Sequence, residues 1–102
     1  MPIPVIALIL AAAATLTVIV LAIIYYDDII KWFKERNDLK VSDKDNIAFT
    51  IQQKLENGEF NVVQGIFNKR TDKVVDGQKI RTEKVDAEFA RIHGNEELVI
   101  YE

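Results

Sequence analysis

Residues 3–26, IPVIALILAAAATLTVIVLAIIYY, decide the fold that the sequence predicts. This stretch has no charged side chain, whereas all 13 Lys/Arg and all 16 Asp/Glu residues of the 102-residue chain follow Tyr26. At a rise of about 1.5 Å per residue, a helix of this length would cross the roughly 30 Å hydrocarbon core of a bilayer. The sequence therefore predicts a single transmembrane helix over residues 1–26.

Two other interpretations of this apolar stretch fit it less well. A cleaved signal peptide needs a basic start and a shorter apolar core, and no Lys or Arg precedes the stretch. A buried helix of a water-soluble core would need more covering chain than the 76 residues that follow position 26. We therefore expect an uncleaved anchor.

The flanking charges predict an orientation for this anchor. No basic residue lies before the stretch, and Lys31, Lys34, Arg36 and Lys40 follow it. Loops rich in Lys and Arg remain on the cytoplasmic side of a membrane. We expect a single-pass membrane protein with its N-terminus outside and its C-terminal domain cytoplasmic.

Two groups of residues are expected to act at the membrane. Small side chains on one ridge would let this helix pack closely against another helix in lipid. They are Ala7, Ala11, Ala14, Thr15 and Ala22. Aromatic and basic side chains after the span would sit at the headgroup level as interface anchors. They are Tyr25, Tyr26, Trp32, Lys31, Lys34 and Arg36.

The charged part of the chain predicts a juxtamembrane helix and linker over residues 27–41 and a small α+β domain over residues 42–102. Ile47, Ile51 and Leu55 recur every four residues and favour a helix over 43–56, which Asn57-Gly58 would end. Residues 60–67 are rich in β-formers and predict a strand, with Gly65 indicating a bulge or a close backbone contact.

The rest of this domain completes the predicted order α-β-β-α-β with an antiparallel sheet. A turn over residues 69–72 leads to a returning strand in two pieces, 73–75 and 79–81. A helix begins at Thr82 and ends at His93-Gly94, and residues 98–101 form a last short strand.

The residues that carry chemistry in enzymes and metal sites are sparse in this sequence. The chain has no Cys and one His, so it lacks a thiolate site or a pair of imidazoles, and it has no Gly-rich phosphate-binding motif. Asp43, Asp45 and Asn46 begin like a calcium loop, but Ala48 and Lys54 stand where Gly and Glu are required. We expect a non-enzymatic protein without a cofactor.

The expected partners follow from this architecture. A net charge of −3 and acidic residues among the basic ones of the hairpin argue against nucleic acid, and no small-molecule substrate is identified. The sequence favours a docking or accessory subunit that holds a protein partner at the lipid bilayer. The alternative is a small membrane protein that self-assembles into a homo-oligomer. Hairpin edge strands, or the terminal strand if it lies at an edge, would offer free backbone for a partner strand.

Overall fold

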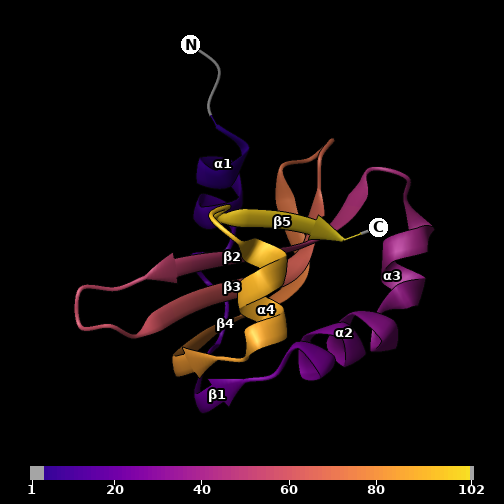
Figure 1. The fold of residues 1–102 in the computed structure, drawn as a ribbon. Helices are drawn as coiled ribbons and strands as arrows, with labels where there is room; N and C mark the ends of the chain where they lie inside the picture. Colours follow the sequence, from indigo (N-terminus) through magenta and orange to yellow (C-terminus); the bar gives the residue numbers. More distant parts are fainter. Residues whose placement is uncertain (1–3, 102) are drawn as a thin grey trace.

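A five-stranded mixed sheet organises the chain in the computed structural model, which describes residues 4–101 (Figure 1). The strand order is β1-β4-β3-β2-β5, so β1 and β5 form the two edges. Strand β1 runs parallel to β4, and the other neighbouring strands are antiparallel. The elements are α1 (Val5–Ala12), β1 (Val18–Ile24), α2 (Tyr26–Glu35), α3 (Asn37–Ser42), β2 (Asn46–Lys54), β3 (Phe60–Asn68), β4 (Lys73–Val85), α4 (Ala87–His93) and β5 (Leu98–Tyr101).

The predicted membrane span is wrong. Residues 1–3 of the predicted span lie outside the described residues. The rest form an eight-residue helix, α1, and an edge strand, β1, joined by a turn, and Tyr26 begins α2. Within residues 4–101, no helix has the length and apolar character needed to cross a bilayer. The expected transmembrane fold and the expected orientation, with the N-terminus outside and a cytoplasmic domain, are both overturned with it.

The composition of the second half of this stretch explains the correction. Residues 17–24, TVIVLAII, are mostly β-branched, and such side chains lose rotamer freedom in a helix but fit a pleated sheet. Parallel pairing with β4 supplies backbone partners, for example a 2.9 Å hydrogen bond from Lys79 N–H to the Thr17 carbonyl oxygen. A short apolar run fits a strand as well as a helix segment, so hydropathy alone does not separate the two structures.

The helix expected over residues 43–56 is also wrong, because this segment is strand β2. A spacing of four residues satisfies the strand period of two as well as the helix period. Phe49 lies between Ile47 and Ile51 in sequence, and all three belong to one apolar cluster. Asn57-Gly58 forms the turn between β2 and β3, with Gly58 at φ 88°, instead of ending a helix.

The predictions for the C-terminal half are mostly confirmed. Strand β3 matches the expected 60–67 strand. Its hairpin partner β4 is one strand of thirteen residues instead of the two pieces expected, and its register with β3 shifts between Ile66 and Phe67. Gly65 makes the expected close contact, since an added Cβ there would lie 2.8 Å from the Asp76 carbonyl oxygen. The last helix begins at Ala87, with Asp86 as its N-cap in place of Thr82, which lies inside β4. Asp86 accepts a 2.8 Å hydrogen bond from Phe89 N–H as its N-cap, and Gly94 ends the helix at φ 53°.

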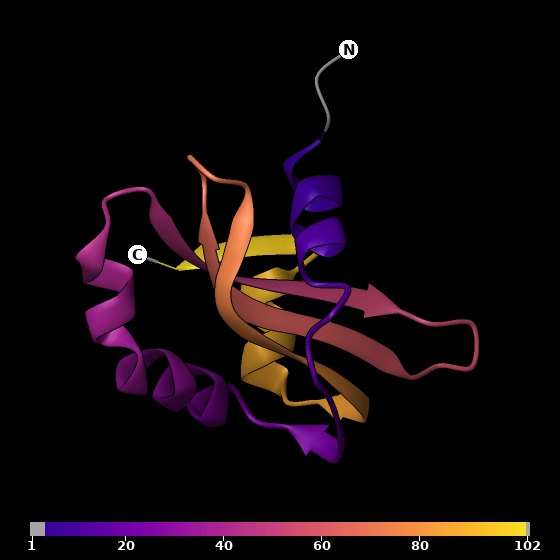
Figure 2. The same ribbon diagram turned by 180° about the vertical axis from the view of Figure 1, so that it is seen from behind.

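The sheet is covered on both faces by helices. Helix α1 lies on one face, where Ile9 and Ala13 pack against Phe49 and Phe67. On the opposite face, α2 and α4 contribute Ile29 and Phe89 to a second cluster (Figure 2). The terminal strand β5 lies at an edge of the sheet, which is the position at which the sequence predicts that it offers free backbone. The hairpin strands β3 and β4 are interior, so they offer none.

Candidate functional site

A groove with a cavity volume of about 570 Å³ opens between the α2–α3 segment and the edge formed by β5 and α4. In Figure 1, α2 and α3 run along one side of α4 and β5. Most of the lining side chains are aliphatic or aromatic, and no carboxylate side chain belongs to the lining. The lining residues are Tyr26, Ile30, Phe33, Lys34, Asn37, Lys40, Ala48, Ile92, Val99, Ile100 and Tyr101.

Polar contacts fix α2 on the sheet and so set one wall of the groove. The helix begins where Tyr26 N–H donates a 2.9 Å hydrogen bond to Asp86 Oδ2. One turn later, Gln64 Nε2 donates across 2.9 Å to the Ile29 carbonyl oxygen, and Gln64 is fully buried. Buried polar groups with partners of this kind fix a single arrangement because leaving them unpaired is costly.

An aromatic contact and a chain of hydrogen bonds position the opposite wall. The rings of Phe33 and Tyr101 lie 5.0 Å apart, which links α2 to β5. Tyr101 Oη lies 2.7 Å from Thr50 Oγ1, and Thr50 Oγ1 lies 2.8 Å from His93 Nε2. His93 Nδ1 lies 2.9 Å from the Glu96 carbonyl oxygen. Four elements of the fold therefore converge behind Tyr101.

The direction of this chain follows from the donors and acceptors present. A carbonyl oxygen only accepts, so His93 Nδ1 carries a proton and donates to Glu96. Nε2 then accepts from the Thr50 hydroxyl, whose oxygen accepts in turn from the Tyr101 hydroxyl. Burial lowers the pKa of His93 and raises the pKa of Tyr101 to about 12, so both rings are neutral at pH 7.

Positive charge at the rim is the main electrostatic feature of the groove. Lys34 on α2 and Lys40 on α3 both line it, and Asn37 lies between them along the chain. A second hollow of about 380 Å³ shares Lys40, Ile100 and Tyr101 with the groove and adds Lys69. The combined arrangement presents an apolar floor beside ammonium groups.

The small residues predicted to pack helices in a membrane are dispersed over three segments. Ala7 and Ala11 lie on α1, Ala14 and Thr15 in the turn that follows, and Ala22 on β1. All five are exposed to solvent. Their predicted role depended on one continuous helix, and the structure does not bring them together on a ridge.

The predicted interface anchors lie in and beside α2. Tyr26 and Lys34 line the groove, whereas Tyr25 and Lys31 are exposed. Trp32 packs within the chain, with the Arg36 guanidinium 3.9 Å from its ring centroid. Arg36 also pairs with Asp76, with Nε 2.7 Å from Oδ2, so this cation joins the end of α2 to β4.

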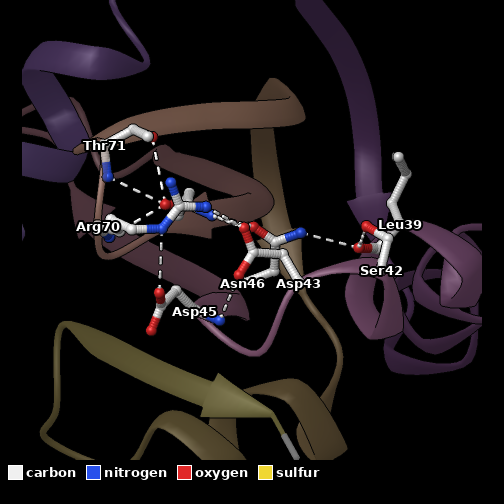
Figure 3. Close-up of polar contacts among 8 residues, drawn as sticks. Leu39, Ser42, Asp43, Asp45, Asn46, Arg70 and Thr71 are labelled. Carbon is white, nitrogen blue, oxygen red and sulfur yellow. Dashed lines mark hydrogen bonds and ion pairs between the residues drawn. The ribbon is translucent and has the colours of Figure 1, made fainter.

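A separate polar cluster ties the loop before β2 to the turn after β3 (Figure 3). Arg70 pairs with the carboxylates of Asp43 and Asp45, and Asn68 donates to Asn46 Oδ1 across 2.8 Å. The pKa of Asp43 is lowered because the Asp45 backbone N–H donates to its carboxylate and Arg70 also hydrogen-bonds it. These carboxylates stabilise two loops. Within residues 4–101, no group of three acidic or imidazole side chains is arranged to hold a metal ion.

Sequence reasoning missed most of the groove. It predicted a helix and linker over residues 27–41 and a strand over residues 98–101, but it did not join them. The two parts are separated by more than sixty residues, and only the sheet order places β5 opposite α2. Ile29, Ile30 and Phe33 form the apolar stripe that any helix packed on a sheet has, so the helix pattern gave no separate signal of a groove.

The chain was compared with models of protein families, with curated proteins and with solved structures, and no match was found in any of the three.

Proposed function

We propose that this protein binds a small apolar carboxylate in the groove between α2 and β5. The observation that carries the proposal is the combination of a largely apolar lining with two lysines and no carboxylate side chain. Ligand sites in proteins are typically concave and apolar, have volumes of about 300–1,000 Å³ and contain a few polar groups that fix orientation. The groove, at about 570 Å³, has these properties.

The wall and the rim would recognise different parts of such a ligand. Ile30, Phe33 and Val99 offer apolar surface to a hydrocarbon chain or ring. Lys34 and Lys40 offer ammonium groups to the carboxylate, and a charge-assisted hydrogen bond contributes about 1.5–3 kcal/mol. Because the Lys34 side chain is exposed, solvent screening favours the lower end of this range.

The proposal is binding without catalysis, which keeps the sequence-based expectation of a non-enzymatic protein. The single imidazole supports it, because His93 is 1% exposed and both of its ring nitrogens have partners within the protein. Tyr101 is neutral at physiological pH and donates to Thr50. Neither side chain is free to act as a general base toward a bound ligand.

The test compares octanoate with 1-octanol, which share an alkyl chain and differ in charge. Affinities are measured by titration while the backbone amide signals are followed by NMR. We expect octanoate to bind more tightly and to shift signals of residues 26–35 and 98–101. The double substitution Lys34→Gln and Lys40→Gln should weaken octanoate about tenfold and leave octanol unchanged, since about 1.4 kcal/mol corresponds to a factor of ten.

Two further variants separate the groove from the remaining surface. Lys54→Gln is the matched control, because Lys54 is exposed at the end of β2 and does not line the groove. Ile30→Trp should fill the groove and abolish binding of both compounds, with circular dichroism checking that the fold is retained. Equal affinity for octanoate and octanol, or signal shifts confined to β1, would refute the proposal.

A further inference from the structure

Exposed apolar side chains follow one another along β1, the edge strand next to β4. Four consecutive side chains are exposed there: Val18 by 54%, Ile19 by 37%, Val20 by 75% and Leu21 by 42%. Successive residues of a strand point to opposite faces of its sheet. Neither face of β1 is therefore covered along this stretch.

The strand also lacks the features that protect sheet edges. Exposed edges are usually blunted by charged residues, proline, bulges or a covering segment. The seven residues of β1, VIVLAII, include no charge and no proline. Figures 1 and 2 both show β1 at the margin of the sheet with no described element beyond it.

The backbone of β1 offers hydrogen-bonding groups along this edge. Lys79 N–H donates to the Thr17 carbonyl oxygen, so Thr17 directs its peptide groups toward β4. Backbone groups alternate in direction along a regular strand, which places the N–H and C=O groups of Val18 and Val20 on the outer side. The alternation does not reach the end of β1, where the Ile24 carbonyl oxygen accepts a 2.9 Å hydrogen bond from Asp86 N–H. The most exposed side chain of the strand thus lies on a residue whose peptide groups face outward.

We propose that this edge pairs with the same edge of a second copy of the chain. A two-fold axis at Val20 would make the strands antiparallel and place Val18 opposite Ala22 of the second copy, and Ile19 opposite Leu21. Every position of this contact joins one apolar side chain to another. Each chain carries a net charge of −3, but the seven residues of β1 are uncharged, so the two paired strands bring no like charges together.

The pairing leaves the groove free. In the resulting sheet, β1 of each copy is central and β5 lies at each outer end, because these two strands are the opposite edges of the monomer sheet. The two copies would then present one groove each. Self-association is therefore independent of the proposed ligand, and either proposal can fail without the other.

The absence of cysteine allows a direct test by cross-linking. Val20→Cys would place two thiols on the two-fold axis, and hydrogen-bonded partners in an antiparallel pair have Cα atoms about 5.5 Å apart, within disulfide range. Val41→Cys is the matched control, because Val41 is 69% exposed on α3, away from β1. Under mild oxidation, we expect the Val20→Cys chain to cross-link at least tenfold faster than the control.

The mass of the unmodified chain provides the second measurement. Sedimentation equilibrium should give twice the chain mass of 11.6 kDa, and Val20→Lys should give the mass of one chain while retaining its circular dichroism spectrum. A wild-type monomer together with equal cross-linking of the two cysteine variants would overturn the proposal. Monomers that sediment with phosphatidylcholine vesicles, and cease to do so as Val20→Lys, would also overturn it, because lipid would then be the occupant of this edge.

Discussion

Replacing Thr50 with valine should destabilise the protein by about 2 kcal/mol through a single buried atom. Thr50 is fully buried, and its hydroxyl links Tyr101 to His93 through hydrogen bonds of 2.7 and 2.8 Å. Valine keeps the shape of the side chain but removes the hydroxyl. The change therefore isolates the polar contribution of this residue from its packing.

The magnitude depends on what the substitution leaves unpaired. His93 is 1% exposed, so its Nε2 atom would lose its donor in a site that water does not replace, at a cost of about 1–3 kcal/mol. Tyr101 is partly exposed and lines the groove, so the loss of its partner should cost less than the loss at His93. Thr50→Ser is the matched control, because it keeps the hydroxyl and loses one methyl group, a change of about 0.8 kcal/mol.

Urea denaturation followed by the fluorescence of Trp32, the single tryptophan, measures both variants. All samples need one protein concentration, because self-association makes apparent stability depend on it. We expect the valine variant to be clearly less stable than the serine variant, with unchanged m-values. A valine variant as stable as the wild type, or more stable than the serine variant, would show that the hydrogen-bond chain does not stabilise the fold.

Two further predictions concern His93 and Gly65. Burial lowers the pKa of His93 in the folded chain below its ordinary 6.5, so the unfolded chain binds a proton that the folded chain excludes. The contribution of His93 to the free energy of unfolding is therefore complete above about pH 6.5. It falls on acidification by at most about 1.4 kcal/mol per pH unit. Urea midpoints that do not change between pH 8 and pH 5 would contradict this prediction. Gly65→Ala should cost about 1–3 kcal/mol, because its Cβ would lie 2.8 Å from the Asp76 carbonyl oxygen and 3.2 Å from the Phe49 ring. A melting temperature within 2 °C of the wild type would contradict it, since about 1 kcal/mol shifts a domain of this size by about 4–8 °C.

Local chemistry was enough to predict much of the C-terminal half. The β-forming composition of residues 60–67, the tight turn before Lys73 and the glycine after His93 each act within a few residues of chain. The type and the ends of such elements follow from the preferences of neighbouring residues, so they can be predicted without knowing which distant segment they contact. The groove was only partly predictable, since its α2 wall has a local helical pattern and its β5 wall depends on the order of strands in the sheet.

The sequence by itself determined that residues 1–26 are apolar and uncharged, and that every charge lies after them. Only the tertiary structure decided whether this apolar stretch becomes one long helix or a short helix and a strand. The physical reason is that an apolar segment favours burial of its side chains and pairing of its backbone, but its composition does not specify which part of the chain it packs against or pairs with. Here β4 supplies hydrogen bonds to β1, and the apolar clusters of the sheet receive Ile9 and Ile24 from the two halves of the stretch.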